Sequence, residues 1–117
     1  MENMIKSAVV LILIMGMSAP AYSGTGGGQV QIAQVGHWSL DKVYFYTSSH
    51  IDPPACNTYH KRWVLDISTD IGRAQYSLLL SAAMSGKDVV IGGRNECDLD
   101  SDSESVGWVG FPVVLPE

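Results

Sequence analysis

The stretch Asp70–Ile91, DIGRAQYSLLLSAAMSGKDVVI, constrains the fold of this chain more than any other part. Its first half predicts an amphipathic helix, because apolar side chains recur at helical spacing. Ser68, Thr69 and Asp70 all suit the N-cap, and Gly86 stands where a left-handed C-cap is expected. The following run, 88–92, predicts a short strand. Outside the extreme N-terminus no other segment predicts a helix convincingly, so the rest of the domain must consist mainly of strands.

This helix has two apolar sides, and a small sheet can cover only one of them. The first stripe is expected to pack on the core and consists of Ile71, Ala74, Gln75, Leu78, Leu79 and Ala82. The second side has no evident partner within the chain, and we interpret it as a candidate homo-oligomer interface. It consists of Tyr76, Leu80, Ala83 and Met84.

Residues 1–23 have the features of a secretory signal peptide. Lys6 precedes the uncharged run Ala8–Met17, and small residues follow it. A membrane anchor is the alternative, but the run is shorter than the about 20 residues that a spanning helix needs. Cleavage is expected after Ala21 or Ser23, with Ser23 preferred. The sequence therefore predicts an exported protein, periplasmic or secreted, with no membrane span in its mature chain.

The mature chain is expected to hold a flexible Gly-rich leader, 24–28, and one domain, 29–117. The whole chain has 117 residues and a formal net charge of −5, without a cluster of basic residues. Nucleic-acid partners are therefore excluded, since the phosphate backbone requires Lys and Arg.

Cys56 and Cys97 are the two cysteines of the chain. Export favours a disulfide between them, because small exported domains often depend on one. A free thiol pair and metal ligation are the alternatives, although neither cysteine has a second cysteine or a histidine at metal spacing.

The predicted elements follow the order strand, strand, strand, helix, strand, strand. This order matches a five-stranded Greek-key barrel of the oligonucleotide/oligosaccharide-binding (OB) type, in which the helix lies between strands three and four. A small α+β sandwich is the alternative. A change of phase near Ala33–Gln34 predicts a bulge in the first strand. The strands are expected at 29–38, 43–47, 59–67, 88–92 and 106–115.

Several segments together resemble a group of small exported bacterial proteins. More distantly, the helix–Gly–strand unit is similar to the receptor-binding B subunits of subtilase cytotoxin and related pertussis-like toxins. The resemblance to the toxin subunits implies an OB-type barrel, a pentameric ring with helices lining its pore, and recognition of sialoglycans. No sugar-contacting residue of those subunits maps onto a position here. The segments that carry the resemblance are Cys56, 62–67, 72–83, 85–91, Cys97 and 104–106.

Catalytic and metal-binding patterns are missing from the sequence. No Gly-x-Ser-x-Gly turn is present, and His37, His50 and His60 lack a partner at ligand spacing, so each is expected to be an exposed polar residue. The acidic run 98–104 lacks the Gly and Glu of a helix–loop–helix calcium site and is interpreted as a solvated loop. The sequence thus predicts no cofactor, no metal and no enzymatic activity.

Tyr44 and Tyr46 are the candidate ligand-binding residues. Strand alternation places both on the face opposite Val43 and Phe45, and exposed tyrosines can stack on sugar rings. Ordinary cross-strand packing is the alternative. We therefore expect a non-enzymatic binding module with a glycan or protein partner. The alternative is a periplasmic or cell-surface structural protein without a glycan ligand.

Overall fold

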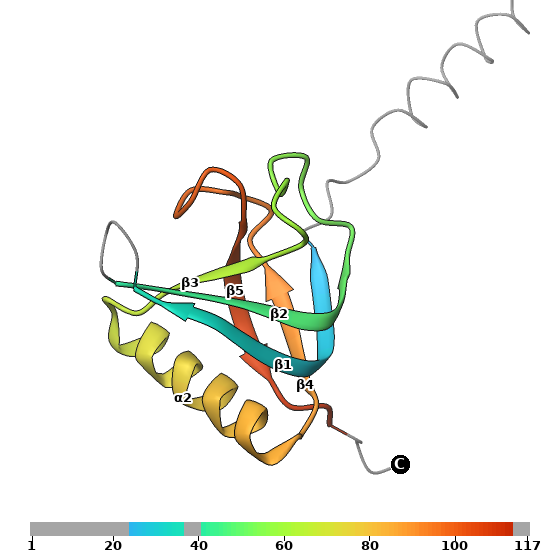
Figure 1. Cartoon of the computed structure of the whole chain (residues 1–117), viewed down its shortest axis with the longest axis vertical. Coiled ribbons are helices and arrows are strands. Elements are labelled where there is room, and N and C mark those ends of the chain that lie inside the picture. Colours follow the sequence, from blue (N-terminus) through green and yellow to red (C-terminus); the bar gives the residue numbers. More distant parts are fainter. Residues whose placement is uncertain (1–23, 37–40, 114–117) are drawn as a thin grey trace, which may run out of the picture.

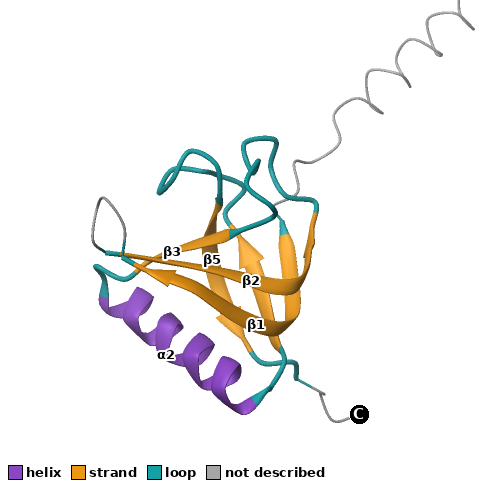
Figure 2. Cartoon of the chain, in the orientation of Figure 1, coloured by secondary structure: helices purple, strands orange, loops and turns teal. Residues whose placement is uncertain are grey.

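The computed structural model describes residues 24–36 and 41–113. They form five strands and one helix in the predicted order (Figures 1 and 2). The predicted signal peptide, His37, Trp38 and the end of the last predicted strand lie outside the described residues. The elements are β1 (Thr25–Val35), β2 (Lys42–Ile51), β3 (Trp63–Asp66), α2 (Asp70–Ser85), β4 (Val89–Gly93) and β5 (Glu104–Gly110).

The strands form one mixed sheet that closes on itself in the order β1-β2-β3-β5-β4. Neighbouring strands are antiparallel except β3 and β5, which pair in parallel. β1 closes the ring, because it pairs with β2 along its length and with β4 through its first residues. Helix α2 lies against β1, β3 and β5, across one end of the strands (Figure 2).

The Gly-rich stretch is not the flexible leader that the sequence predicts. Thr25 to Gly27 pair with β2 on one side, and Thr25 to Gly28 pair with β4 on the other. A side chain would not fit between these neighbours. A Cβ on Gly26 would lie 2.7 Å from the carbonyl oxygen of Ser49, and one on Gly27 would lie 2.8 Å from that of Val89. The glycines therefore allow β1 to lie close to both partners where the ring closes.

Other strand boundaries also differ from prediction. β5 spans Glu104–Gly110, so it begins before the predicted 106 and ends ahead of Phe111 and Pro112. β2 continues to Ile51, beyond the predicted end at 47, because it pairs with the Gly-rich end of β1. β3 begins only at Trp63, because His60 and Lys61 turn the chain in left-handed conformations with φ of 52° and 60°. The predicted bulge in β1 is confirmed by a register shift between Ile32 and Gln34.

The core fills the ring and the interface with the helix. Its largest side chains are Phe45 and Trp63, whose rings stack with centroids 6.4 Å apart. The buried core cluster consists of Val30, Val43, Phe45, Trp63, Leu65, Leu79, Ala82, Val89, Ile91 and Val106.

The helix packs on the core through only part of the predicted stripe, since Leu79 and Ala82 are buried as predicted. Its buried residues are Gly72, Leu79 and Ala82, whereas Ile71, predicted in the core stripe, is 71% exposed. Gly72 explains this orientation, since a Cβ at that position would lie 1.8 Å from the carbonyl oxygen of Asp66. The glycine lets the first turn contact the end of β3, which turns Ile71 outward.

Both predicted helix ends and the disulfide are confirmed. Thr69 is the N-cap and accepts a hydrogen bond from the amide of Gly72 at 3.0 Å. Gly86 has φ of 70°, the left-handed C-cap conformation. Cys56 and Cys97 are bonded across 41 positions of sequence and tie the β2–β3 connection to the β4–β5 connection. A disulfide that closes a loop of this length stabilises the folded state by roughly 2–4 kcal/mol.

Candidate functional site

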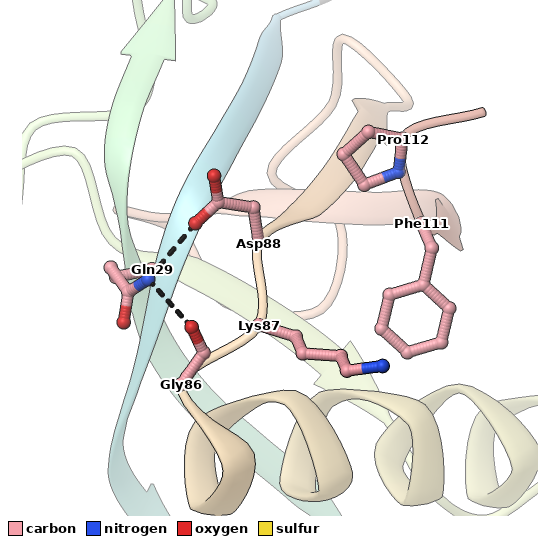
Figure 3. A pocket seen from close by; sticks show the side chains of 6 residues that line it. All are labelled: Gln29, Gly86, Lys87, Asp88, Phe111 and Pro112. Carbon is pink, nitrogen blue, oxygen red and sulfur yellow. Dashed lines mark hydrogen bonds between the residues drawn. The ribbon is translucent and has the colours of Figure 1, made fainter. Parts of the chain in front are cut away.

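A pocket of about 650 Å³ opens where the C-terminal end of α2 meets the middle of β1 and the segment after β5 (Figure 3). Its walls come from three parts of the chain that are distant in sequence and meet only when the ring closes. None of its lining residues was predicted as a site. They are Gln29, Gly86, Lys87, Asp88, Phe111 and Pro112.

One wall is fixed by the side-chain amide of Gln29. Its Nε2 donates to the carbonyl oxygen of Gly86 at 2.9 Å and to Oδ1 of Asp88 at 2.9 Å (Figure 3). The first bond satisfies a carbonyl at the helix C-terminus, which has no partner inside the helix. The second holds the Asp88 carboxylate in one orientation. The link from β1 to the α2–β4 turn therefore presents a positioned carboxylate at the pocket.

The facing wall is apolar. Phe111 follows β5 and its side chain is 41% exposed. Pro112 comes next, and its fixed φ restricts the chain at the edge of the pocket. In Figure 3 the side chain of Lys87 extends from the helix end toward the ring of Phe111. Lys87 makes no ion pair with any residue that the structure describes.

These groups suit a small polyhydroxylated ligand. The exposed face of an aromatic ring can stack on the C–H face of a sugar, while a carboxylate and an ammonium group can hydrogen-bond its hydroxyls. The volume falls in the range of roughly 300–1,000 Å³ that is typical of small-molecule sites.

Tyr46 lines a smaller cavity of about 170 Å³ beside this pocket. Gln29 contributes to both cavities. Gln31 and Ser48 also line the smaller cavity. The cavity lined by the half-buried Tyr46 therefore adjoins the larger pocket at Gln29.

Tyr44 does not form the predicted exposed pair with Tyr46. Val43 and Phe45 do fill the interior, so Tyr44 points outward as expected. However, only 1% of Tyr44 is exposed. The guanidinium of Arg62 covers its ring at 4.3 Å, and its hydroxyl donates to Asp100 at 2.7 Å. A ring covered in this way cannot stack on a sugar.

The acidic run 98–104 is likewise not the solvated loop of the prediction. Arg62 lies between the rings of Tyr44 and Tyr59, and it donates to Asp102 at 2.9 Å. Burial, reinforced by the bond to Asp100, raises the pKa of Tyr44 to about 12. These acidic side chains therefore hold the loop onto the sheet through contacts within the chain.

The predicted interface residues on α2 separate into two pairs. Tyr76 and Ala83 are partly buried and pack against the core. Leu80 and Met84 are 41% and 82% exposed. Of these four residues, Leu80 and Met84 are the two that expose apolar surface.

Two of the predicted exposed histidines differ in their surroundings. His60 is exposed, whereas His50 is buried with 4% of its surface accessible, which corrects the prediction. Among residues 24–36 and 41–113 no group of three or more His, Cys, Asp or Glu side chains could hold a metal ion.

Comparison with known proteins gave no match to a family model, a curated protein or a solved structure. In the described part of the chain no helix is both long and apolar enough to cross a membrane.

Proposed function

We propose that this protein is an exported, non-enzymatic binding module built on an OB-type barrel, and that the pocket beside Phe111 binds a saccharide. The ring order β1-β2-β3-β5-β4 and the helix between β3 and β4 support the OB-type Greek-key arrangement. The Cys56–Cys97 disulfide supports export, because such bonds persist in oxidising compartments.

The observation that carries the binding proposal is the placement of Phe111 opposite Lys87 and Asp88. This combination offers one apolar face and two polar groups of opposite charge, which suits a ligand with a C–H face and many hydroxyls. The Lys87 ammonium adds a preference for sugars that carry a carboxylate, since it has no acidic partner among the described residues. The cavity at Tyr46 offers space for a second sugar unit next to the first.

A glycan array followed by NMR titration of the mature protein tests this proposal. We expect hits enriched in acidic sugars, with chemical-shift changes at Gln29, Asp88 and Phe111. Phe111→Ala and Lys87→Gln should each weaken binding at least tenfold. Ile71→Ala and Lys61→Gln are the matched controls, because they change an exposed apolar residue and an exposed lysine outside the pocket. An array without hits, or equal binding by all four variants, would overturn the proposal.

A second function is favoured by the exposed pair Leu80 and Met84. In this second function, the protein assembles through α2 with copies of itself or with a protein partner, and it needs no glycan ligand. The two functions are compatible, since the pair lies on the helix surface and neither residue lines the pocket. The oligomeric state of the mature protein, measured by light scattering, tests the self-association.

A further inference from the structure

Glu104 is a completely buried carboxylate at the start of β5. Its exposed fraction is 0%. Oε1 lies 2.7 Å from Nε2 of His50, and Oε2 accepts hydrogen bonds from the backbone amides of Gly24 and Asn95, both at 3.0 Å. A buried carboxylate is costly unless hydrogen bonds and positive charge surround it.

His50 supplies part of this compensation. Its Nδ1 lies 2.7 Å from the carbonyl oxygen of Lys61, which can only accept, so Nδ1 carries a proton. The other ring nitrogen, Nε2, is hydrogen-bonded to Oε1 of Glu104. The oxygen Oε2, on the other side of the carboxylate, faces only backbone amides.

Gly24 is fitted closely to this carboxylate. A Cβ on Gly24 would lie 2.1 Å from Oε1 of Glu104 and 3.0 Å from Nε2 of His50. Its carbonyl oxygen accepts from the amide of Gly93 at 2.8 Å. Gly93 has the same restriction, because a Cβ there would lie 2.0 Å from Oε2 of Glu104. The nitrogen and the carbonyl oxygen of Gly24 are therefore both hydrogen-bonded. A residue with a side chain would not fit at this position.

The held nitrogen belongs to the residue that follows Ser23, one of the two predicted cleavage positions. We propose that the leader is cut between Ser23 and Gly24, and that the new α-ammonium of Gly24 forms a buried ion pair with Glu104. This proposal rests on the export that we propose above. Hydrolysis places the new carboxylate on Ser23, which leaves with the leader, and the amine of Gly24 takes up a proton. A neutral amide with one N–H thereby becomes a cation with three.

Processing at this bond stabilises the folded domain. Hydrogen bonds between charged groups are roughly twice as strong as neutral ones, and the ammonium also compensates the negative charge on Oε2. Cleavage after Ala21 would instead leave Gly24 as an internal amide and give no such gain. The domain therefore gains stability only after the leader has been removed at one particular bond.

Intact-mass measurement of the protein exported from its full precursor is the first test. We expect a chain that begins at Gly24. A chain that begins at Tyr22, or an uncut precursor, would overturn the proposal.

Urea denaturation at pH 7 is the second test, on mature chains released from a fusion tag with either Gly24 or Ser23 as first residue. Both contain all five strands and the helix. The chain that begins at Gly24 should have an unfolding equilibrium constant roughly 10- to 100-fold smaller, as for a charge-assisted hydrogen bond. When both chains also carry Glu104→Gln, their unfolding equilibrium constants should be equal. Equal stability of the two starting chains would overturn the proposal.

Amine acylation gives a readout that remains available if Glu104→Gln does not fold. A free α-amine has a pKa near about 8 and reacts readily at neutral pH. In the folded chain that begins at Gly24 we expect acylation of the α-amine at least tenfold slower than in urea. Equal rates in the two states would contradict the ion pair. Sugar binding enters none of these readouts, so either proposal can fail alone.

Discussion

The imidazole of His50 lies flat on the indole of Trp63, with ring centroids 3.6 Å apart and ring planes 11° apart. This stacking joins β2 to β3 in the core and holds the histidine in line with Glu104. Trp63 is fixed in turn, because its Nε1 donates to Oγ1 of Thr47 at 3.0 Å. A buried polar pair is thus built into the apolar core, with each partner held by other elements.

Replacing His50 should strongly destabilise the fold. His50→Gln removes the imidazole that is hydrogen-bonded to the buried Glu104 carboxylate at 2.7 Å. Breaking a buried pair in this way costs roughly 3–5 kcal/mol, to be measured as the free energy of unfolding in urea. His60→Gln is the control, because His60 is exposed and should change stability by less than about 0.5 kcal/mol. A similarly small change for both variants would show that the pair contributes little.

Tyr44 should titrate above the ordinary range of a tyrosine. Its pKa is raised to about 12 by burial, and by its hydrogen bond to Asp100, from an ordinary value of 10.0. Because the folded state holds this proton more tightly, stability is fully present below pH 10 and falls as pH rises toward 12. Phenolate absorbance should show a late phase that is absent in Tyr44→Phe. Identical phenolate titration curves for the wild-type protein and Tyr44→Phe would contradict the buried, hydrogen-bonded environment of Tyr44.

Features set by neighbouring residues were predictable from the sequence. The helix, its caps at Thr69 and Gly86, and the order of the elements follow from local spacing and composition. The Gly-rich start of β1 was predicted as flexible because its partners, β2 and β4, are distant in sequence. His50 was predicted as exposed for the same reason, since Glu104 is 54 positions away.

The candidate site depended even more on distant contacts. Gln29, the α2–β4 turn and Phe111 come together only when β1 closes the ring, and no local pattern indicates that meeting. The exposed Ile71 shows a related effect. A helical period predicts which residues share a face, whereas the contact of Gly72 with Asp66 decides which face turns inward.

The hydroxyl of Ser105 should contribute to the pH dependence of folding stability in the acidic range. Its hydroxyl donates to Asp98 and is the main cause that lowers the pKa of that carboxyl below the usual 3.8. Stability from this bond is present above pH 3.8 and is lost as pH falls through the lower folded pKa. Ser105→Ala should move the pKa of Asp98, followed by carboxyl NMR, up toward its ordinary value. Ser81→Ala, on the exposed helix surface, should leave it unchanged.

Gly72→Ala tests whether contact or helix propensity decides the stability of α2. Propensity alone predicts a gain of about 1 kcal/mol. The added Cβ would lie 1.8 Å from the backbone oxygen of Asp66, so the helix must shift. We expect a net loss of about 1–3 kcal/mol, as for overpacked cores. Ser77→Ala, exposed on the same helix, should be neutral or slightly stabilising. A gain for Gly72→Ala in urea denaturation would show that the contact is easily relieved.

Leu80→Glu combined with Met84→Glu should dissociate an oligomer without unfolding the protomer. Both side chains are exposed, at 41% and 82%, so the charges meet water in the monomer and are buried only in an assembly. Light scattering should report a smaller mass for the double variant, with the melting temperature of the monomer unchanged. Tyr76→Glu is the contrasting control, because Tyr76 packs against the core and its replacement should lower stability. A wild-type protein that is strictly monomeric, or a double variant that unfolds, would remove Leu80 and Met84 as an interface.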